Sequence, residues 1–210
     1  MKSTLKNMVV VLFTITLISS AAVGGVYMLT KAPIEQAKAA VENSARQNVL
    51  PEGDYTLVKA DTLTVDGLQV VVSHMLRGGN NAPYYAVKSL SNNGYGGQLA
   101  LMVGFDAEAT VQNIEVLESK ETPGLGSKLS LTDTVKNPVR HDVVGRKMDN
   151  KGLKVRKDGG DVDALTAATI SSRAYLDAVE RAHKALVQSL SPSDDAESLN
   201  KTTEGGYDGE

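Results

Sequence analysis

The sequence predicts an α+β protein, in which an antiparallel β-sheet with helices follows one N-terminal transmembrane helix. A run without charged side chains occupies residues 8–29. Short segments rich in Val, Ile, Leu and Tyr come next, bounded by Gly, Asn, Asp or Pro, as β-strands are. Near the end, residues 170–190 repeat small or apolar residues every four positions, which indicates an amphipathic helix.

The uncharged run, residues 8–29, is long enough to span a membrane. About 20 such residues form a helix of about 30 Å, which matches the hydrocarbon core of a bilayer. Unpaired backbone N–H and C=O groups are not tolerated in lipid, because water is absent there, so this segment should be a helix. A cleaved signal peptide is the alternative, with residues 20–22 as a small-residue cleavage site. The run is longer than the apolar region of ordinary signal peptides, so we favour a retained anchor.

Charge placement alone does not fix the orientation of this anchor. Lys2 and Lys6 lie before it and favour a cytoplasmic N-terminus, residues 1–7, whereas Lys31 lies after it and weakens that argument. We expect a single-pass protein whose main domain lies outside the cytoplasm.

Residues 30–50 are expected to form a helical connector. Pro33 should end the membrane helix, and a second helix should cover residues 34–50. A Pro-Glu-Gly-Asp turn then opens the main domain, residues 51–190. Five strands are predicted in it, at residues 55–59, 68–76, 84–90, 99–105 and 111–117. Their close spacing favours antiparallel pairing, because a parallel crossover needs about a dozen residues or more.

The end of the chain is predicted to hold one more strand, a long helix and a disordered tail. The strand is expected at residues 152–157. The helix of residues 170–190 should bury one stripe of side chains: Ile170, Ala174, Ala178, Val179, Ala182, Leu186 and Leu190. Residues 191–210 are acidic and rich in Gly and Ser, so we expect them to be disordered.

Composition excludes several classes of function. The chain has no Cys, so disulfides, cysteine-ligated iron–sulfur clusters and thiol nucleophiles are impossible. The three His residues do not have metal-site spacing, and we expect no metal site. The net charge is −3, and the acidic tail leaves a near-neutral body without a basic face for nucleic acid. P-loop, HExxH and Gly-x-Ser-x-Gly motifs are absent from the sequence.

Residues 163–172 read Asp-Ala-Leu-Thr-Ala-Ala-Thr-Ile-Ser-Ser and open the long helix. Hydroxyl residues at such a position ordinarily cap free backbone N–H groups. The same helix end, with unpaired donors and a positive dipole, also suits a phosphate. The hydroxyl of Thr169 could be esterified to that phosphate, and the small side chains of Ala167 and Ala168 would let a bulky group approach.

Two glycine-rich segments precede this motif. Residues 118–127 read Glu-Ser-Lys-Glu-Thr-Pro-Gly-Leu-Gly-Ser, which is typical of a tight turn, although Gly124 and Gly126 would also let backbone lie against a flat ring. Residues 93–98 read Asn-Gly-Tyr-Gly-Gly-Gln and taken alone predict a hairpin loop.

These three motifs, in this order, resemble the FMN-binding domain of the G-type subunit of Rnf-type ion-translocating electron transport complexes. The resemblance extends from the N-terminal helix to about Leu190. It implies that a flavin transferase, bound transiently, takes FMN from FAD and esterifies it to the last Thr of the third motif, Thr169. The cofactor-binding residues implied by the matched motifs are Asp163, Thr166, Ala168, Thr169, Thr122, Gly124, Leu125 and Gly126. Leu125, the one large apolar residue of its turn, is expected to shield a face of the flavin ring.

The chain departs from the family pattern at three places, of which Ser171, where Thr is common, is a mild exchange. Ala167 stands where the family usually has Gly, which argues against a positive φ at this residue. Ser119 stands where many relatives have His, so no role of that His transfers to this chain.

The resemblance implies a membrane-anchored electron carrier with covalent FMN and no catalytic site of its own. Its expected partners are the other subunits of a complex that couples electron flow between ferredoxin and NAD to ion movement. The expected location is the bacterial inner (cytoplasmic) membrane, with the main domain on the periplasmic side. Two alternatives remain. One is the subunit of sodium-translocating NADH:quinone oxidoreductase that has the same domain, which would use the same Thr169, and the other is a membrane-tethered binding module without a flavin.

Overall fold

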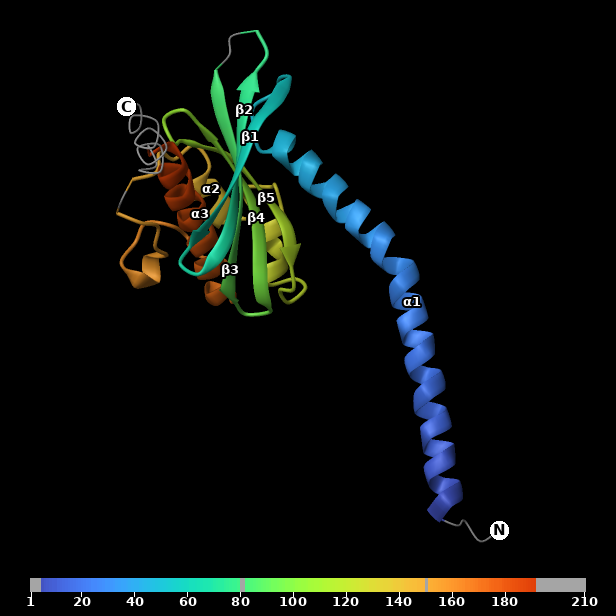
Figure 1. Ribbon diagram of the computed structural model, residues 1–210. Coiled ribbons are helices and arrows are strands. Elements are labelled where there is room, and N and C mark those ends of the chain that lie inside the picture. The colour runs from blue at the N-terminus through green and yellow to red at the C-terminus, as the bar shows by residue number, and fades with distance from the viewer. Residues whose placement is uncertain (1–4, 80–81, 150, 192–210) are drawn as a thin grey trace, which may run out of the picture. The chain divides into compact units, whose positions relative to one another are not determined.

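Figure 1 shows a computed structural model of the chain, in which residues 5–79, 82–149 and 151–191 are described. The chain divides into two compact units, Met1–Asn43 and Ser44–Glu210. The predicted disorder of residues 191–210 falls, after Ser191, outside the described residues.

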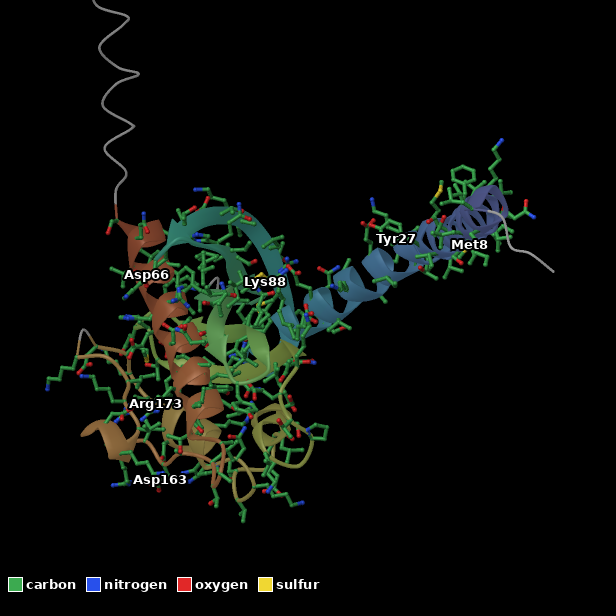
Figure 2. All side chains as sticks on the ribbon, turned by 90° about the horizontal axis from the view of Figure 1, so that it is seen from below. Met8, Tyr27, Asp66, Lys88, Asp163 and Arg173 are labelled. Atoms are coloured by element: carbon green, nitrogen blue, oxygen red, sulfur yellow. The ribbon has the colours of Figure 1, made fainter. Side chains whose placement is uncertain are left out.

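The first unit is formed by helix α1 (Leu5–Asn48), whose last residues belong to the second unit. Within the described part of the chain, α1 is the one helix that is long and apolar enough to span a membrane. Its apolar side chains, including Met8 and Tyr27, project outward and are exposed (Figure 2). The predicted interruption at Pro33 is wrong, because α1 continues through this residue. A proline removes one backbone donor, and a helix can continue past that loss.

The second unit is built on a five-stranded antiparallel sheet with strand order β1-β2-β3-β4-β5. The strands are β1 (Tyr55–Val65), β2 (Leu68–Arg77), β3 (Pro83–Gly94), β4 (Gly97–Asp106) and β5 (Val111–Ser119). The predicted fold class is confirmed, and each strand is longer than the sequence pattern indicated. Between β1 and β2, Asp66 and Gly67 have φ values of 50° and 77°, as a two-residue hairpin turn of type I′ requires.

Helices and turns follow the sheet in the chain. They are η1 (Gly126–Ser130), α2 (Pro138–Val143), η2 (Arg156–Asp158) and α3 (Thr169–Leu190). Helix α3 begins one residue before its predicted start and lies against one face of the sheet (Figure 1). The three short helices were not predicted, because a segment of three to six residues is too short for a periodic pattern to develop.

The main core lies between α3 and the sheet. The inward stripe of α3, from Ala174 to Leu186, packs on alternate residues of the strands, such as Val87 and Leu101. The opposite face is covered in part by the end of α1 and the residues after it, where Val49 packs on Met102. Strand β4 is consequently buried on both faces.

The strand predicted at residues 152–157 is wrong. Leu153 and Val155 are buried and Lys154 between them is exposed, so the alternation of a strand is present. The backbone, however, makes only an isolated bridge between Val155 and Val162 before turning into η2. The alternation here reflects an extended segment that packs on the core.

Candidate functional site

A cleft of about 490 Å³ forms where three segments distant in sequence meet. They are the loop between β3 and β4, the turn after β5, and the start of α3. The lining residues are Tyr95, Glu121, Thr122, Leu125, Gly126, Ala167, Ala168, Thr169, Ile170 and Ser171. The three motifs that the sequence singled out therefore build one site, with a volume in the range of small-molecule pockets, about 300–1,000 Å³.

The start of α3 presents Thr169 without a capping side chain. Ala168 occupies the N-cap position, where no side-chain hydrogen bond is made. The Ser172 hydroxyl, in the first turn of the helix, donates to the Ala168 carbonyl at 3.0 Å and accepts from the Leu165 N–H. Thr169 is therefore not the N-cap of α3, which is the role that a hydroxyl residue at a helix start ordinarily has. The helix end offers a positive dipole toward the cleft.

One positively charged side chain lies beside the Thr169 hydroxyl. The ammonium of Lys157, in η2, lies 3.5 Å from the Thr169 Oγ1 atom. The η2 segment is fixed to α3 because Asp158 accepts two hydrogen bonds from the Arg173 guanidinium, each 2.7 Å long. These bonds also hold the pKa of Asp158 below its usual range. The arrangement places a positive charge next to the position that an anion bonded to Thr169 would occupy.

The turn of residues 122–126 closes the other side of the cleft. Leu125 and Ser127 N–H groups both donate to the Thr122 carbonyl, at 3.1 and 3.3 Å. Gly124 has a φ of 77°, which glycine adopts without strain. Leu125 is 42% exposed in the cleft and presents an apolar surface there.

The eight residues predicted to bind a cofactor fall into two groups. Five line the cleft: Thr169, Ala168, Thr122, Leu125 and Gly126. Three do not: Asp163, Thr166 and Gly124. Asp163 pairs with Arg156, and its N–H donates to Asp142, so it holds η2 in place (Figure 2 labels Asp163 and Arg173 at this end of the domain). Thr166 is exposed in the turn before α3.

Several residues at the cleft were missed by sequence reasoning. Tyr95, 71% exposed at the cleft, belongs to a loop interpreted as a simple hairpin. Ile170 was expected in the buried stripe of α3 but is 47% exposed, because the first turn of the helix faces the cleft. Glu121 and Ser171 are inside quoted motifs but received no role. Lys157 lay in the segment misread as a strand.

Ala167 adopts a φ of 60°, so the expectation against a positive φ at this position is wrong. A left-handed conformation costs an L-residue about 1–2 kcal/mol, which the surrounding turn and helix start must offset.

We therefore expect Ala167→Gly to stabilise the protein by about 0.5–1 kcal/mol, because glycine adopts this φ without the steric cost. The melting temperature of the flavin-free protein should rise by about 2 °C. Ala168→Gly is the matched control, since Ala168 has a φ of −136° and gains no such relief. Equal melting shifts in the two variants would contradict the assignment of strain to Ala167.

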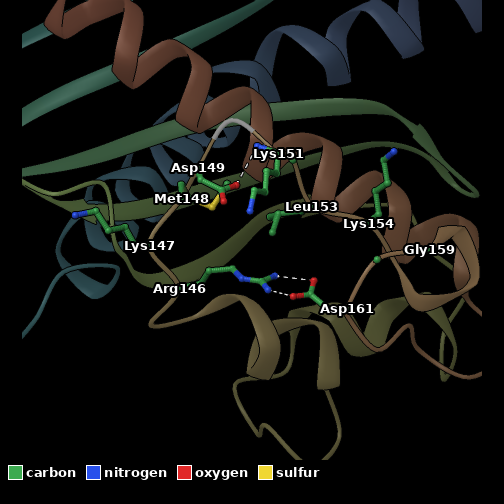
Figure 3. A pocket seen from close by; sticks show the side chains of 11 residues that line it. Arg146, Lys147, Met148, Asp149, Lys151, Leu153, Lys154, Gly159 and Asp161 are labelled. Atoms are coloured by element: carbon green, nitrogen blue, oxygen red, sulfur yellow. Dashed lines mark hydrogen bonds and ion pairs between the residues drawn. The ribbon is translucent and has the colours of Figure 1, made fainter.

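A second cleft, of about 570 Å³, lies around residues 146–161 (Figure 3). Its wall is rich in charge, but Arg146 is engaged by Asp161, and Lys147 lies 3.3 Å from Glu108. The segments that line it contain none of the three motifs. Charged, solvated walls of this kind lack the apolar surface that small-molecule sites usually have, so the first cleft is the stronger candidate for a small-molecule site.

A serine, a histidine and an aspartate meet near the far end of α3. Ser189 Oγ lies 2.9 Å and Asp61 Oδ2 lies 3.1 Å from His74. Both contacts are to the same ring nitrogen, Nε2, whereas a catalytic triad needs one partner on each nitrogen. The group is therefore a polar tie between α3 and the sheet. Among the described residues no three His, Asp or Glu side chains gather in a way that could hold a metal ion.

Comparison with known proteins finds relatives along most of the chain. Residues 94–184, which include every residue that lines the first cleft, match the FMN-binding domain family. The chain is 33% identical over 189 residues to the G-type subunit of the ion-translocating oxidoreductase complex of Shewanella amazonensis, an alignment covering 86% of each chain. It is 31% identical over 191 residues to the same subunit of Aliivibrio fischeri, covering 87% of this chain and 90% of the relative. The equivalent protein of Vibrio atlanticus is 31% identical over 174 residues, covering 78% and 81%.

Proposed function

The chain belongs to the family of G-type subunits of ion-translocating oxidoreductase complexes, and from this premise we propose that it holds FMN through a phosphoester to Thr169 and relays electrons within such a complex. The family and the FMN-binding domain together make it an FMN-carrying membrane subunit for electron transfer. The observation that carries the more detailed proposal is the convergence of three motifs on one cleft, with the Thr169 hydroxyl at an uncapped helix start.

The residues of the cleft fit FMN in three respects. The uncapped start of α3 and the Lys157 ammonium beside Thr169 are suited to bind a phosphate. Exposed apolar or aromatic side chains are suited to contact a flat ring, namely Leu125, Ile170 and Tyr95. Close approach to the backbone is allowed by small residues on both sides, such as Gly126 and Ala168.

The linkage requires a transfer reaction in which Thr169 is the nucleophile. Its hydroxyl oxygen would attack the FMN-side phosphorus of FAD, the pyrophosphate bond would break, AMP would leave, and the hydroxyl proton would pass to a base of the flavin transferase. Atoms balance without an added oxidant or reductant. In the product, Lys157 would face the phosphodiester charge, and the helix dipole would favour the same charge.

FMN supplies the capacity to accept and release one or two electrons, and the protein sets its position and surroundings. Within the proposed complex the electrons would pass between ferredoxin and NAD by way of other subunits. The relatives that match along most of the chain belong to ion-translocating oxidoreductase complexes, which favours this assignment over the sodium-translocating quinone reductase.

Flavin fluorescence of the denatured protein on a gel tests the proposal against the alternative of a binding module without flavin. Protein made with the flavin transferase should fluoresce after denaturation, because only a covalent cofactor survives it. A folded, full-length protein without fluorescence would support the binding module. Copurification with the other components of the ion-translocating complex tests the assignment to that complex.

We also propose that α1 is retained as an anchor and that the domain lies on the periplasmic side. The chain has no Cys, so single cysteines report position without background. In intact spheroplasts, a membrane-impermeant maleimide should label Lys151→Cys on the domain and should not label Lys6→Cys before the anchor. Both sites should react after the membrane is permeabilised. The reverse pattern would contradict the orientation, and mature protein that begins after Ala22 would contradict retention of the anchor.

A further inference from the structure

Glu121 is a buried carboxylate at the junction of the three segments that form the cleft. The residue is only 7% exposed. Its Oε2 atom accepts a hydrogen bond of 2.7 Å from the Ser171 hydroxyl, in the first turn of α3. Its Oε1 atom accepts one of 3.3 Å from the Gly96 N–H, in the loop between β3 and β4. Because Glu121 itself begins the turn after β5, its carboxylate joins all three segments.

The chain leaves room for this carboxylate by placing glycines around it. A Cβ atom added at Gly94 would lie 2.6 Å from Oε1, and one added at Gly126 would lie 2.6 Å from Oε2. Real Cβ atoms essentially never approach other atoms this closely. Side chains at these two positions would therefore displace the Glu121 carboxylate, and at Gly94 they would also meet the Gly97 carbonyl oxygen.

The same carboxylate also lines the cleft. In the described part of the chain no Lys or Arg forms an ion pair with Glu121, so its charge is met by hydrogen bonds alone. A fixed charge in a partly buried site acts on neighbouring charges more strongly than one in water. A negative charge disfavours the addition of electrons to a group held nearby.

We propose that Glu121 is a positioning residue that ties the cleft together and that its charge lowers the midpoint potential of the flavin held there. The second half rests on the proposed function, since it needs a flavin in this cleft. The first half does not, because the tie exists in the flavin-free protein.

Glu121→Gln separates charge from shape. The glutamine oxygen can accept from the Gly96 N–H, while its NH₂ group donates to the Ser171 hydroxyl oxygen. Both contacts are thereby kept, although the direction of the Ser171 hydrogen bond is reversed, and the charge is lost. Ser171→Ala is the matched control, because it removes one hydrogen bond and leaves the charge. Glu121→Ala removes the tie and leaves the Gly96 N–H without its acceptor.

Redox titration of the flavin-loaded variants tests the charge. At the midpoint potential of the wild type, Glu121→Gln should raise the ratio of reduced to oxidised flavin about tenfold, the order of magnitude expected from one nearby charge. Ser171→Ala should change that ratio much less. A wild-type ratio in Glu121→Gln, or an equal shift in Ser171→Ala, would overturn the electrostatic role.

Melting of the flavin-free variants tests the tie. Glu121→Ala should melt below both the wild type and Glu121→Gln, and the backbone amides of residues 94–97 should exchange hydrogen faster. Melting and exchange equal to the wild type would overturn the tie, whichever residue bears the flavin. Flavin found on a residue other than Thr169 would overturn the proposed function and would leave this second result unaffected.

Discussion

Thr169→Ala is expected to remove all covalently bound FMN from the chain, the largest effect that we predict. The side chain of alanine has no oxygen to form the phosphoester, and no repacking restores one. Protein produced with the flavin transferase should show no flavin fluorescence on a denaturing gel. The fold should survive, because Thr169 is partly exposed at the start of α3 and, among the described residues, its hydroxyl makes one long hydrogen bond, to Lys157.

Two controls sharpen this result. Thr169→Ser keeps a hydroxyl and should retain at least part of the covalent flavin. Thr166→Ala changes another threonine of the same motif, one that does not line the cleft, and should keep the phosphoester at Thr169. Full incorporation of flavin into Thr169→Ala would refute the linkage.

The second large effect is expected from Gly96→Ala, which should separate the β3–β4 loop from the turn after β5. A Cβ atom at Gly96 would overlap the Lys120 carbonyl oxygen. Because that oxygen belongs to the backbone, it cannot rotate away as a side chain can. The shift would also break the hydrogen bond from the Gly96 N–H to Glu121. We expect a loss of about 2–3 kcal/mol in the free energy of unfolding and a marked fall in flavin incorporation.

Gly78→Ala is the matched control for Gly96→Ala. A Cβ at Gly78 would lie 3.5 Å from the nearest atom, the Asp54 carbonyl oxygen, which is an ordinary contact. Its cost should stay below about 1 kcal/mol. Urea denaturation of the two variants measures the difference, and equal stabilities would show that the loops do not meet as closely as described.

The fold was predictable from the sequence where a pattern runs over many residues. The β-strands alternate or are continuously apolar, and α3 repeats its stripe from Ala174 to Leu186. The effect of Pro33 was misread because a proline removes one backbone hydrogen bond but does not by itself end a helix. Residues 152–157 were misread because extended packing on a core gives the same alternation as a strand.

The site was predictable only in part, for a different reason. Thr169, Thr122 and Leu125 lie in motifs, and their family resemblance identified them. Glu121 was missed because a single Glu in a turn carries no periodic signal. The structural role of Glu121 comes from its contacts with Ser171 and Gly96, which lie 50 and 25 positions away in the chain. Such contacts arise from the tertiary fold alone.

Peptide mapping by mass spectrometry tests the central claim most directly. The full chain should be produced with the flavin transferase, digested, and its flavin-bearing peptide fragmented. We predict one FMN mass, attached through phosphate, on Thr169 in the peptide that contains the start of α3. An FMN adduct on another residue, or folded protein from the same host whose peptides are all unmodified, would contradict the covalent attachment at Thr169.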